Sequence, residues 1–110
     1  MQVHHVSDKT TPIAETMGVL EDMKREGKIR VIGVSNASRL QLEEYSNCGV
    51  LDADQERFSM LDRRVERNGV LDFCRDKDVS FLAYSPLENG SALSPVFEDP
   101  SMEVFPNWYR

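Results

Sequence analysis

Residues 27–36 read Gly-Lys-Ile-Arg-Val-Ile-Gly-Val-Ser-Asn, and this stretch decides the fold of the chain. Gly27 follows a helical pattern and can adopt the left-handed conformation that closes a helix. The β-branched residues after it are nearly continuous, which predicts a strand that is buried on both faces. Ser35 and Asn36 stand where the apolar run stops. Because polar groups at the carboxyl ends of parallel strands face the ligand in α/β sheets and barrels, these two residues are predicted to lie at a binding site.

Strands and helices alternate outward from this stretch. Further strands are predicted over residues 2–6, 50–58 and 79–84, and helices over 12–25, 39–48 and from 62–68 through Cys74. This alternation implies right-handed βαβ units and an α/β fold with a parallel sheet. No GxGxxG and no phosphate-loop motif is present, so a doubly wound nucleotide fold lacks its usual fingerprint. The pattern therefore favours a segment of a (β/α)8 TIM barrel.

Local signals define the helix ends. Thr11 can cap the first helix, and Pro12 suits the first helical position. Ser38 and Gln41 have the spacing of a capping box at the start of the second helix. No periodicity continues beyond residue 87, so we expect a partial barrel over residues 1–87 and an irregular loop or disordered tail over 88–110.

Composition excludes several classes of protein. The chain has 110 residues and a formal net charge of −6, which argues against binding to nucleic acid or to an anionic membrane surface. No run approaches the length of a membrane-spanning helix, and the first residues lack the features of a signal peptide. Cys48 and Cys74 belong to no CxxC or Cys/His pattern, so we predict no metal site and two reduced thiols in a cytoplasmic protein.

Four further segments of the chain, considered together with residues 27–36, carry a set of motifs whose order and spacing are informative. They are Gln-Val-His at 2–4, Thr-Pro-Ile-Ala-Glu-Thr-Met at 11–17, Gln55 with Phe-Ser-Met-Leu-Asp-Arg at 58–63, and Leu-Ala-Tyr-Ser-Pro-Leu at 82–87. Together with residues 27–36 they resemble the aldo-keto reductase family, over nearly the whole chain. The resemblance implies strands four to seven, approximately, of that family's barrel. Family members are complete barrels, roughly three times as long as this chain.

The resemblance implies an oxidoreductase that transfers a hydride from NADPH to a small aldehyde or ketone. Ser35, Asn36 and Gln55 match residues that bind the nicotinamide carboxamide, since a hydroxyl and two amides can satisfy its donors and acceptor. Tyr84 matches the aromatic residue on which the nicotinamide ring stacks. From local sequence alone, an ordinary turn before the Ser38 cap is the favoured interpretation of Ser35 and Asn36, and a barrel-wall tyrosine explains Tyr84 about as well.

Three other positions acquire roles by the same resemblance. His4 matches the histidine that hydrogen-bonds the carbonyl oxygen and orients it, although a packed or solvated histidine near a terminus is the plainer interpretation. Ser85 and Leu87 match the start of the loop that wraps the pyrophosphate. Asp54 departs from the family pattern, because that strand position is usually apolar and a carboxyl there needs a partner or solvent.

The family's catalytic Asp, Tyr and Lys are expected to precede residue 1. The chain is therefore expected to be a fragment of a reductase that is inactive by itself. Two alternatives remain open: a non-catalytic, nucleotide-binding regulatory subunit on the same scaffold, and an inactive truncated product.

Overall fold

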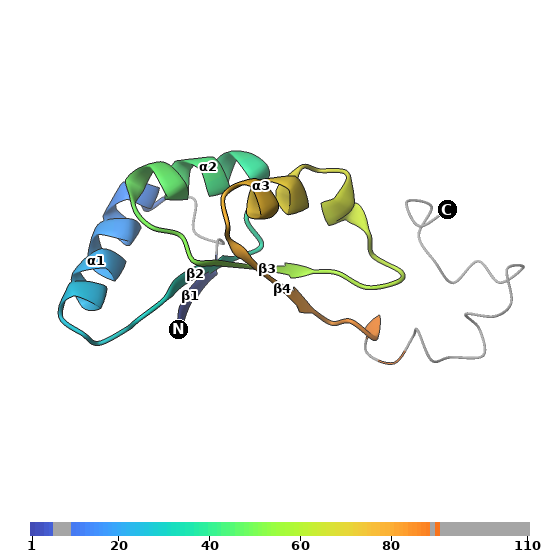
Figure 1. Ribbon diagram of the computed structural model, residues 1–110, viewed down its shortest axis with the longest axis horizontal. Helices are drawn as coiled ribbons and strands as arrows, with labels where there is room; N and C mark the ends of the chain where they lie inside the picture. Colours follow the sequence, from blue (N-terminus) through green and yellow to red (C-terminus); the bar gives the residue numbers. More distant parts are fainter. Residues whose placement is uncertain (6–9, 89, 91–110) are drawn as a thin grey trace, which may run out of the picture.

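A four-stranded parallel sheet forms the centre of the molecule (Figure 1). The computed structural model describes residues 1–5, 10–88 and 90. The strands are β1 (Gln2–His5), β2 (Ile32–Ser35), β3 (Ala53–Arg57) and β4 (Ser80–Tyr84), and each pairs in parallel with the next. A sheet order that follows the sequence order is that of a barrel wall, whereas a doubly wound sheet reverses its order midway. The predicted α/β fold with a parallel sheet is therefore confirmed.

Three helices cover one face of this sheet: α1 (Ile13–Arg25), α2 (Arg39–Cys48) and α3 (Val70–Asp76) (Figure 1). Between them and the strands lies the apolar core. Its fully buried side chains include Tyr45, Phe73, Met17, Ile32, Leu42, Val34 and Val70. All four residues of β2 are buried, as expected for the central strand of a parallel sheet. None of the helices in the described ranges lies on the opposite face of the sheet, and none is long and apolar enough to cross a membrane.

The ends of the first two helices confirm most of the sequence signals. Gly27 has a φ of 75°, the left-handed conformation predicted for a residue just beyond a helix. In α2 the Ser38 hydroxyl accepts the Gln41 amide at 3.3 Å, and the Gln41 side chain accepts the Ser38 amide at 2.9 Å. The prediction for Thr11 is wrong: α1 begins at Ile13 with Pro12 in the cap position, and no side-chain hydrogen bond caps it.

The prediction that residues 62–68 open the third helix is also wrong. Only a short 3-10 turn, η1 (Arg64–Glu66), forms there, and α3 starts at Val70. The buried Asp62 carboxylate accepts hydrogen bonds from the Arg64 guanidinium at 2.9 and 2.6 Å, which closes a local turn instead of a helix. Gly69, with a φ of 83°, then reverses the chain into α3.

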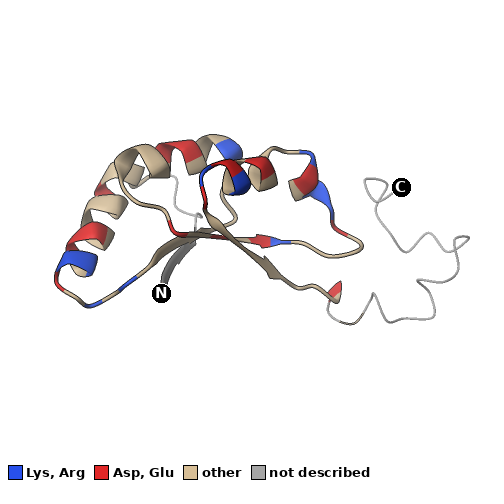
Figure 2. Ribbon diagram, viewed as in Figure 1, with Lys and Arg blue, Asp and Glu red and all other residues tan. Residues whose placement is uncertain are grey.

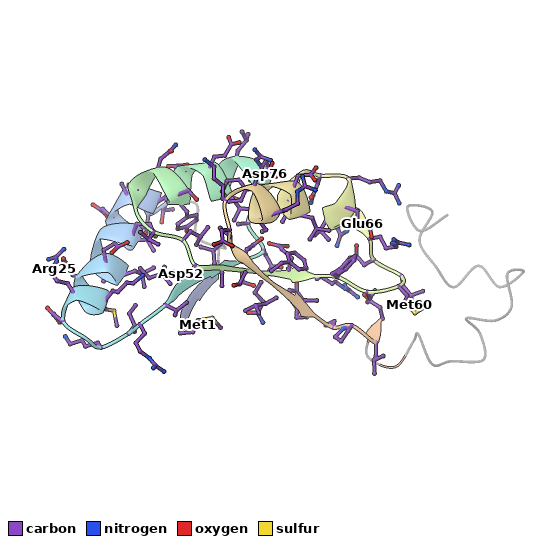
Figure 3. The ribbon with its side chains drawn as sticks, viewed as in Figure 1. Met1, Arg25, Asp52, Met60, Glu66 and Asp76 are labelled. Carbon is purple, nitrogen blue, oxygen red and sulfur yellow. The ribbon has the colours of Figure 1, made fainter. Side chains whose placement is uncertain are left out.

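Charge is distributed unevenly over the strands. Lysine, arginine, aspartate and glutamate lie mainly on the helices and connections, and β3 is the strand that carries both signs (Figure 2). Asp52 lies just before β3 and Met60 lies beyond its carboxyl end (Figure 3). The Asp52 carboxylate accepts the Ile32 amide at 2.9 Å and pairs with Lys24 at 3.1 Å, so it ties β3 to β2 and α1. The predicted irregular tail over 88–110 lies outside the described residues, except for Glu88 and Gly90.

Candidate functional site

The carboxyl ends of β2, β3 and β4 bring together the polar residues that the sequence singled out. Ser35 pairs in register with Gln55, and Gln55 pairs with Leu82 on β4. Residues that pair in register on adjacent strands share one face of a sheet. Ser35 and Gln55 therefore lie side by side on the same face. Asp54, the neighbour of Gln55 on β3, points to the other face and contacts Cys74 of α3. The face that carries Ser35 and Gln55 is therefore the one opposite the helices.

A chain of hydrogen bonds links three of these strand ends. The Tyr84 hydroxyl donates to the Asn36 side-chain oxygen at 2.6 Å, and the Asn36 side-chain amide donates to the Ser35 hydroxyl at 3.3 Å. Ser35 in turn donates to the Gln55 carbonyl at 3.0 Å. The four residues assigned to the nicotinamide by resemblance thus form one connected group.

Asn36 has an unusual backbone conformation for a residue with a side chain. Its φ of 58° lies in the left-handed region, where asparagine is several-fold enriched among non-glycine residues. The Asn36 amide donates to the Gln55 carbonyl at 3.1 Å, and the next amide, that of Ala37, donates to the Glu56 carboxylate at 2.7 Å. Two consecutive amides after β2 are therefore anchored to β3, which sets the direction of the Asn36 side chain.

The donors and acceptors of this group fit a primary carboxamide. Such a group offers one carbonyl acceptor and two N–H donors. The Ser35 hydroxyl and the amides of Asn36 and Gln55 carry both kinds of partner. Within the described part of the chain the Gln55 side-chain amide, which is half-buried, has no hydrogen-bond partner. These residues could therefore hold a nicotinamide ring by its carboxamide, with the half-buried Tyr84 ring beside it.

The structure gives only the backbone position of His4. It lies in β1 opposite Val34, while its neighbour His5 lies opposite Ser35. Following the register onward, His5 occupies the row of Ser35 and Gln55, and His4 occupies the row of Val34 and Asp54. The role assigned to His4 thus remains a prediction. Because His5 lies in the same row as Ser35 and Gln55, the effects of substituting the two histidines can be compared directly.

A tight turn follows β4 and contains the two residues assigned to the pyrophosphate. Ser85 has a φ of 52°, and its carbonyl accepts the Glu88 amide at 3.0 Å. The side chain of Leu87 is exposed. Both residues therefore lie at the same end of the sheet as Asn36 and Gln55, on the connection that leaves β4.

Glu88 fastens this turn to the connection that leaves β3, and sequence reasoning missed it. Its buried carboxylate forms an ion pair with Arg57 and accepts the Ser59 hydroxyl at 2.6 Å. Ser59 also accepts the Asp62 amide at 2.8 Å. The hydrogen bond from Arg57 holds the pKa of Glu88 below its ordinary value. No local pattern in the sequence identifies this role, because the partners of Glu88 lie about thirty positions earlier.

A second acidic group lies on the helix side of β3. Asp54 is completely buried, one of its oxygens has no partner, and the other lies 3.9 Å from the Cys74 sulfur. Burial, followed by the charge of Glu56, raises the pKa of Asp54 to about 8. Burial likewise raises the pKa of Glu56, and burial with the Asp54 charge raises that of Cys74 to about 12. A carboxyl at this strand position was expected to need a partner or solvent. In the folded chain Asp54 is instead mostly the neutral acid at neutral pH, which avoids burying a charge.

Comparison with known proteins places this arrangement in a family. The model of the aldo/keto reductase family matches residues 1–104. The NADH-specific methylglyoxal reductase of Escherichia coli (strain K12) is 45% identical over 89 residues, which are 81% of this chain and 27% of that protein. A thermostable aldo-keto reductase crystallised with the inhibitor epalrestat matches with a TM-score of 0.80 and 36% identity, over 87% of this chain and 35% of that one.

A third match comes from an enzyme with bound cofactor. The aldo-keto reductase from Klebsiella pneumoniae in complex with NADPH has a TM-score of 0.72 and 26% identity, over 84% of this chain and 33% of that chain. The chain thus spans about a third or less of the length of these relatives. With a family model matched over 104 residues and a wall of parallel strands whose carboxyl ends carry the motif residues, the chain belongs to the aldo/keto reductase family.

Proposed function

We propose that this chain supplies the nicotinamide-binding wall of an NAD(P)H-dependent aldo-keto reductase. The observation that carries the proposal is the hydrogen-bonded chain from Tyr84 through Asn36 and Ser35 to Gln55. In it, hydroxyl and amide groups from three adjacent strands converge at one end of the sheet. A site that must fix one face of a flat heterocycle needs such convergence, since each strand contributes only one or two side chains at its tip.

Each residue has a distinct role in the proposal. Ser35, Asn36 and Gln55 bind the carboxamide, and the Tyr84 ring stacks on the nicotinamide while its hydroxyl steadies Asn36. When bound, the cofactor supplies the hydride that reduces the carbonyl carbon of an aldehyde or ketone. Ser85 and Leu87 contact the pyrophosphate from the turn after β4. That turn is short and held by Glu88, which suits a loop that must keep one shape around an anion.

NADPH is the proposed cofactor. The complex of the Klebsiella pneumoniae relative with NADPH favours it, while the name of the Escherichia coli relative points to NADH. The two differ by the 2′-phosphate of the adenosine. No residue of this chain has been assigned to that group, so both nucleotides belong in the test.

His4 is proposed to orient the substrate carbonyl through an imidazole N–H. The backbone register makes His5 the matched alternative, since it shares the row of Ser35 and Gln55. In a protein that contains the complete catalytic machinery, His4→Gln is expected to lower kcat/KM more than His5→Gln. A larger effect of His5→Gln would transfer the role to that residue.

The remaining parts of the proposal concern the whole protein. Its substrate is a small-molecule carbonyl compound, and its compartment is the cytoplasm. The chain contributes the partial barrel over residues 1–87, and without the family's catalytic Asp, Tyr and Lys it does not reduce carbonyls by itself. Steady oxidation of NADPH by the purified chain with an aldehyde, free of host reductases, would contradict that last point.

A nucleotide titration tests the site itself. The full chain is titrated with NADPH and with NADH, and binding is followed by the fluorescence of the reduced nicotinamide. Asn36→Ala is expected to weaken binding at least about tenfold, because it removes hydrogen bonds to the carboxamide and frees Tyr84. Asn47→Ala, at an exposed position of α2, serves as the control and should bind like the unsubstituted chain. Equal affinities for the two variants would contradict the proposed site.

A further inference from the structure

The two faces of β3 serve different purposes. Gln55 faces the proposed nicotinamide site. Its two neighbours on β3, Asp54 and Glu56, lie on the other face, which the helices cover and where Asp54 contacts Cys74 of α3. Although Glu56 lies on the side away from the ligand, it reaches the site through the backbone. Its carboxylate accepts the amide of Ala37, the residue directly after Asn36, at 2.7 Å.

This hydrogen bond fixes the conformation of Asn36. Rotation about φ and ψ of Asn36 moves the peptide planes that precede and follow its Cα. The preceding plane is held by the bond from the Asn36 amide to the Gln55 carbonyl, and the following plane by the bond from the Ala37 amide to Glu56. A left-handed backbone at a residue with a side chain is otherwise less stable than the common conformations. The two anchors supply the interaction that keeps Asn36 at a φ of 58°.

Glu56 can perform this role best as an anion, because a carboxylate accepts a stronger hydrogen bond than a neutral acid. Several groups act on its charge. Asp54 on β3 and Cys74 on α3 face the same interior, and the Arg64 guanidinium of η1 favours the ionised form of Glu56. Since Asp54 is mostly protonated at neutral pH, it avoids placing a second negative charge beside Glu56.

We propose that Glu56 is a positioning residue for the nicotinamide site, which holds Asn36 in its left-handed conformation from the helix side of the sheet through the Ala37 amide. This inference rests on the proposed function, since the site is the one described above. It adds a residue that contacts neither cofactor nor substrate and that acts only through the direction of the Asn36 side chain.

Amide hydrogen exchange measured by NMR on the full chain tests the anchor without any nucleotide. Glu56→Ala removes the acceptor, so exchange of the Ala37 amide should accelerate at least about tenfold, as expected for the loss of a charge-assisted hydrogen bond. Glu56→Gln keeps an oxygen acceptor and should restore most of the protection. Glu26→Ala, at an exposed glutamate beyond α1, is the matched control and should leave Ala37 unchanged. Unchanged exchange in Glu56→Ala would overturn the inference.

Nucleotide affinity provides the second arm. Glu56→Ala should weaken NADPH binding about tenfold, and Glu56→Gln should weaken it less, while cooperative unfolding is retained in both. If Glu56→Ala binds NADPH as tightly as the unsubstituted chain, the positioning role is wrong even though the site is real. If the unsubstituted chain binds no nicotinamide nucleotide, the proposed site is wrong, and the exchange of Ala37 still decides whether Glu56 sets the Asn36 turn.

Discussion

The turns after β2 and after β4 lie at the same end of the sheet and share an uncommon backbone conformation, but charge stabilises them in different ways. The turn after β2 contains Asn36 and the turn after β4 contains Ser85, and both residues are left-handed without being glycine. A glutamate stabilises each turn. Glu56 binds the backbone of the first turn from the buried, helix-covered side of β3, whereas Glu88 belongs to the second turn and pairs with Arg57 at the rim.

The pKa values of the two glutamates are shifted in opposite directions, because desolvation dominates at Glu56 and a cationic partner dominates at Glu88. Desolvation raises the pKa of Glu56, which shares its interior with Asp54. The Arg57 guanidinium lowers the pKa of Glu88. The comparison shows that the surroundings of a carboxylate near the proposed site set the direction of its pKa shift: partial burial raises the pKa of Glu56, and the arginine partner lowers that of Glu88.

The largest expected effect concerns Asp54 on the helix side. Its folded-state pKa of about 8 lies above the ordinary value of 3.8, so the folded chain holds this proton more tightly than the unfolded chain. Stability is therefore lost as the pH rises between these two values. Asp54→Asn does not titrate. Relative to the original chain, its free energy of unfolding should increase by up to about 1.4 kcal/mol per pH unit across that window.

Urea unfolding followed by circular dichroism at several pH values measures this difference. Asn47→Ala, at an exposed position of α2, changes no titratable group and serves as the control; it should follow the pH dependence of the original chain. Parallel pH curves for Asp54→Asn and the original chain would show that Asp54 is ionised in the folded state. Glu56 would then have a second negative charge beside it, contrary to this account.

A smaller effect is expected for the tether of the second turn. Glu88→Gln loses the ion pair with Arg57 and should lower the free energy of unfolding by about 1–2 kcal/mol at pH 7. Because the pKa of Glu88 is lowered on folding, its contribution is present above the ordinary value of 4.5 and is lost as the pH falls through the folded value. The destabilisation caused by Glu88→Gln should thus shrink on acidification. Asp54→Asn has the opposite sign, because it becomes more stable than the original chain as the pH rises.

The matched control for Glu88 is Glu66→Gln. Glu66 also pairs with an arginine, Arg63, but at the surface, where solvent screens the pair and it contributes little to stability. Thermal or urea unfolding at pH 7 should rank Glu88→Gln as the more damaging change. A reversed ranking would mean that the turn after β4 does not depend on its tether.

The smallest expected effect is at the helix that follows the first turn. Ser38→Ala removes the hydroxyl that caps α2 and should cost about 1 kcal/mol of stability, measured by urea unfolding. Ser46→Ala, in the body of the same helix, should change stability by less. Since Ser38 follows Ala37 directly, NADPH affinity should stay within about twofold if Glu56, and not the cap, orients Asn36.

The sequence predicted those parts of the molecule that depend on local patterns. The buried β2, the left-handed Gly27 and the capping box of Ser38 and Gln41 are confirmed because neighbouring residues determine them. The opening of α3 was predicted wrongly, since helix propensity in the charged segment is overridden by the Asp62–Arg64 pair.

In the candidate site, too, some residues can be identified from local motifs and others only from the folded structure. Ser35, Asn36 and Gln55 could be identified from motifs at strand ends, and the need of Asp54 for a partner could be anticipated from its place in a strand. The roles of Glu56 and Glu88 could not. Their hydrogen bonds join positions 19 and 29 to 31 residues apart, and only the register of β2, β3 and β4 brings those positions together.

Native mass spectrometry of the purified chain, with NADPH and with NADH, tests the central claim most directly. The account predicts one nicotinamide nucleotide bound per chain, and loss of that complex in Asn36→Ala but not in Asn47→Ala. A chain that remains free of both nucleotides, or a complex that survives Asn36→Ala unchanged, would contradict the claim that these strand ends form a nicotinamide site.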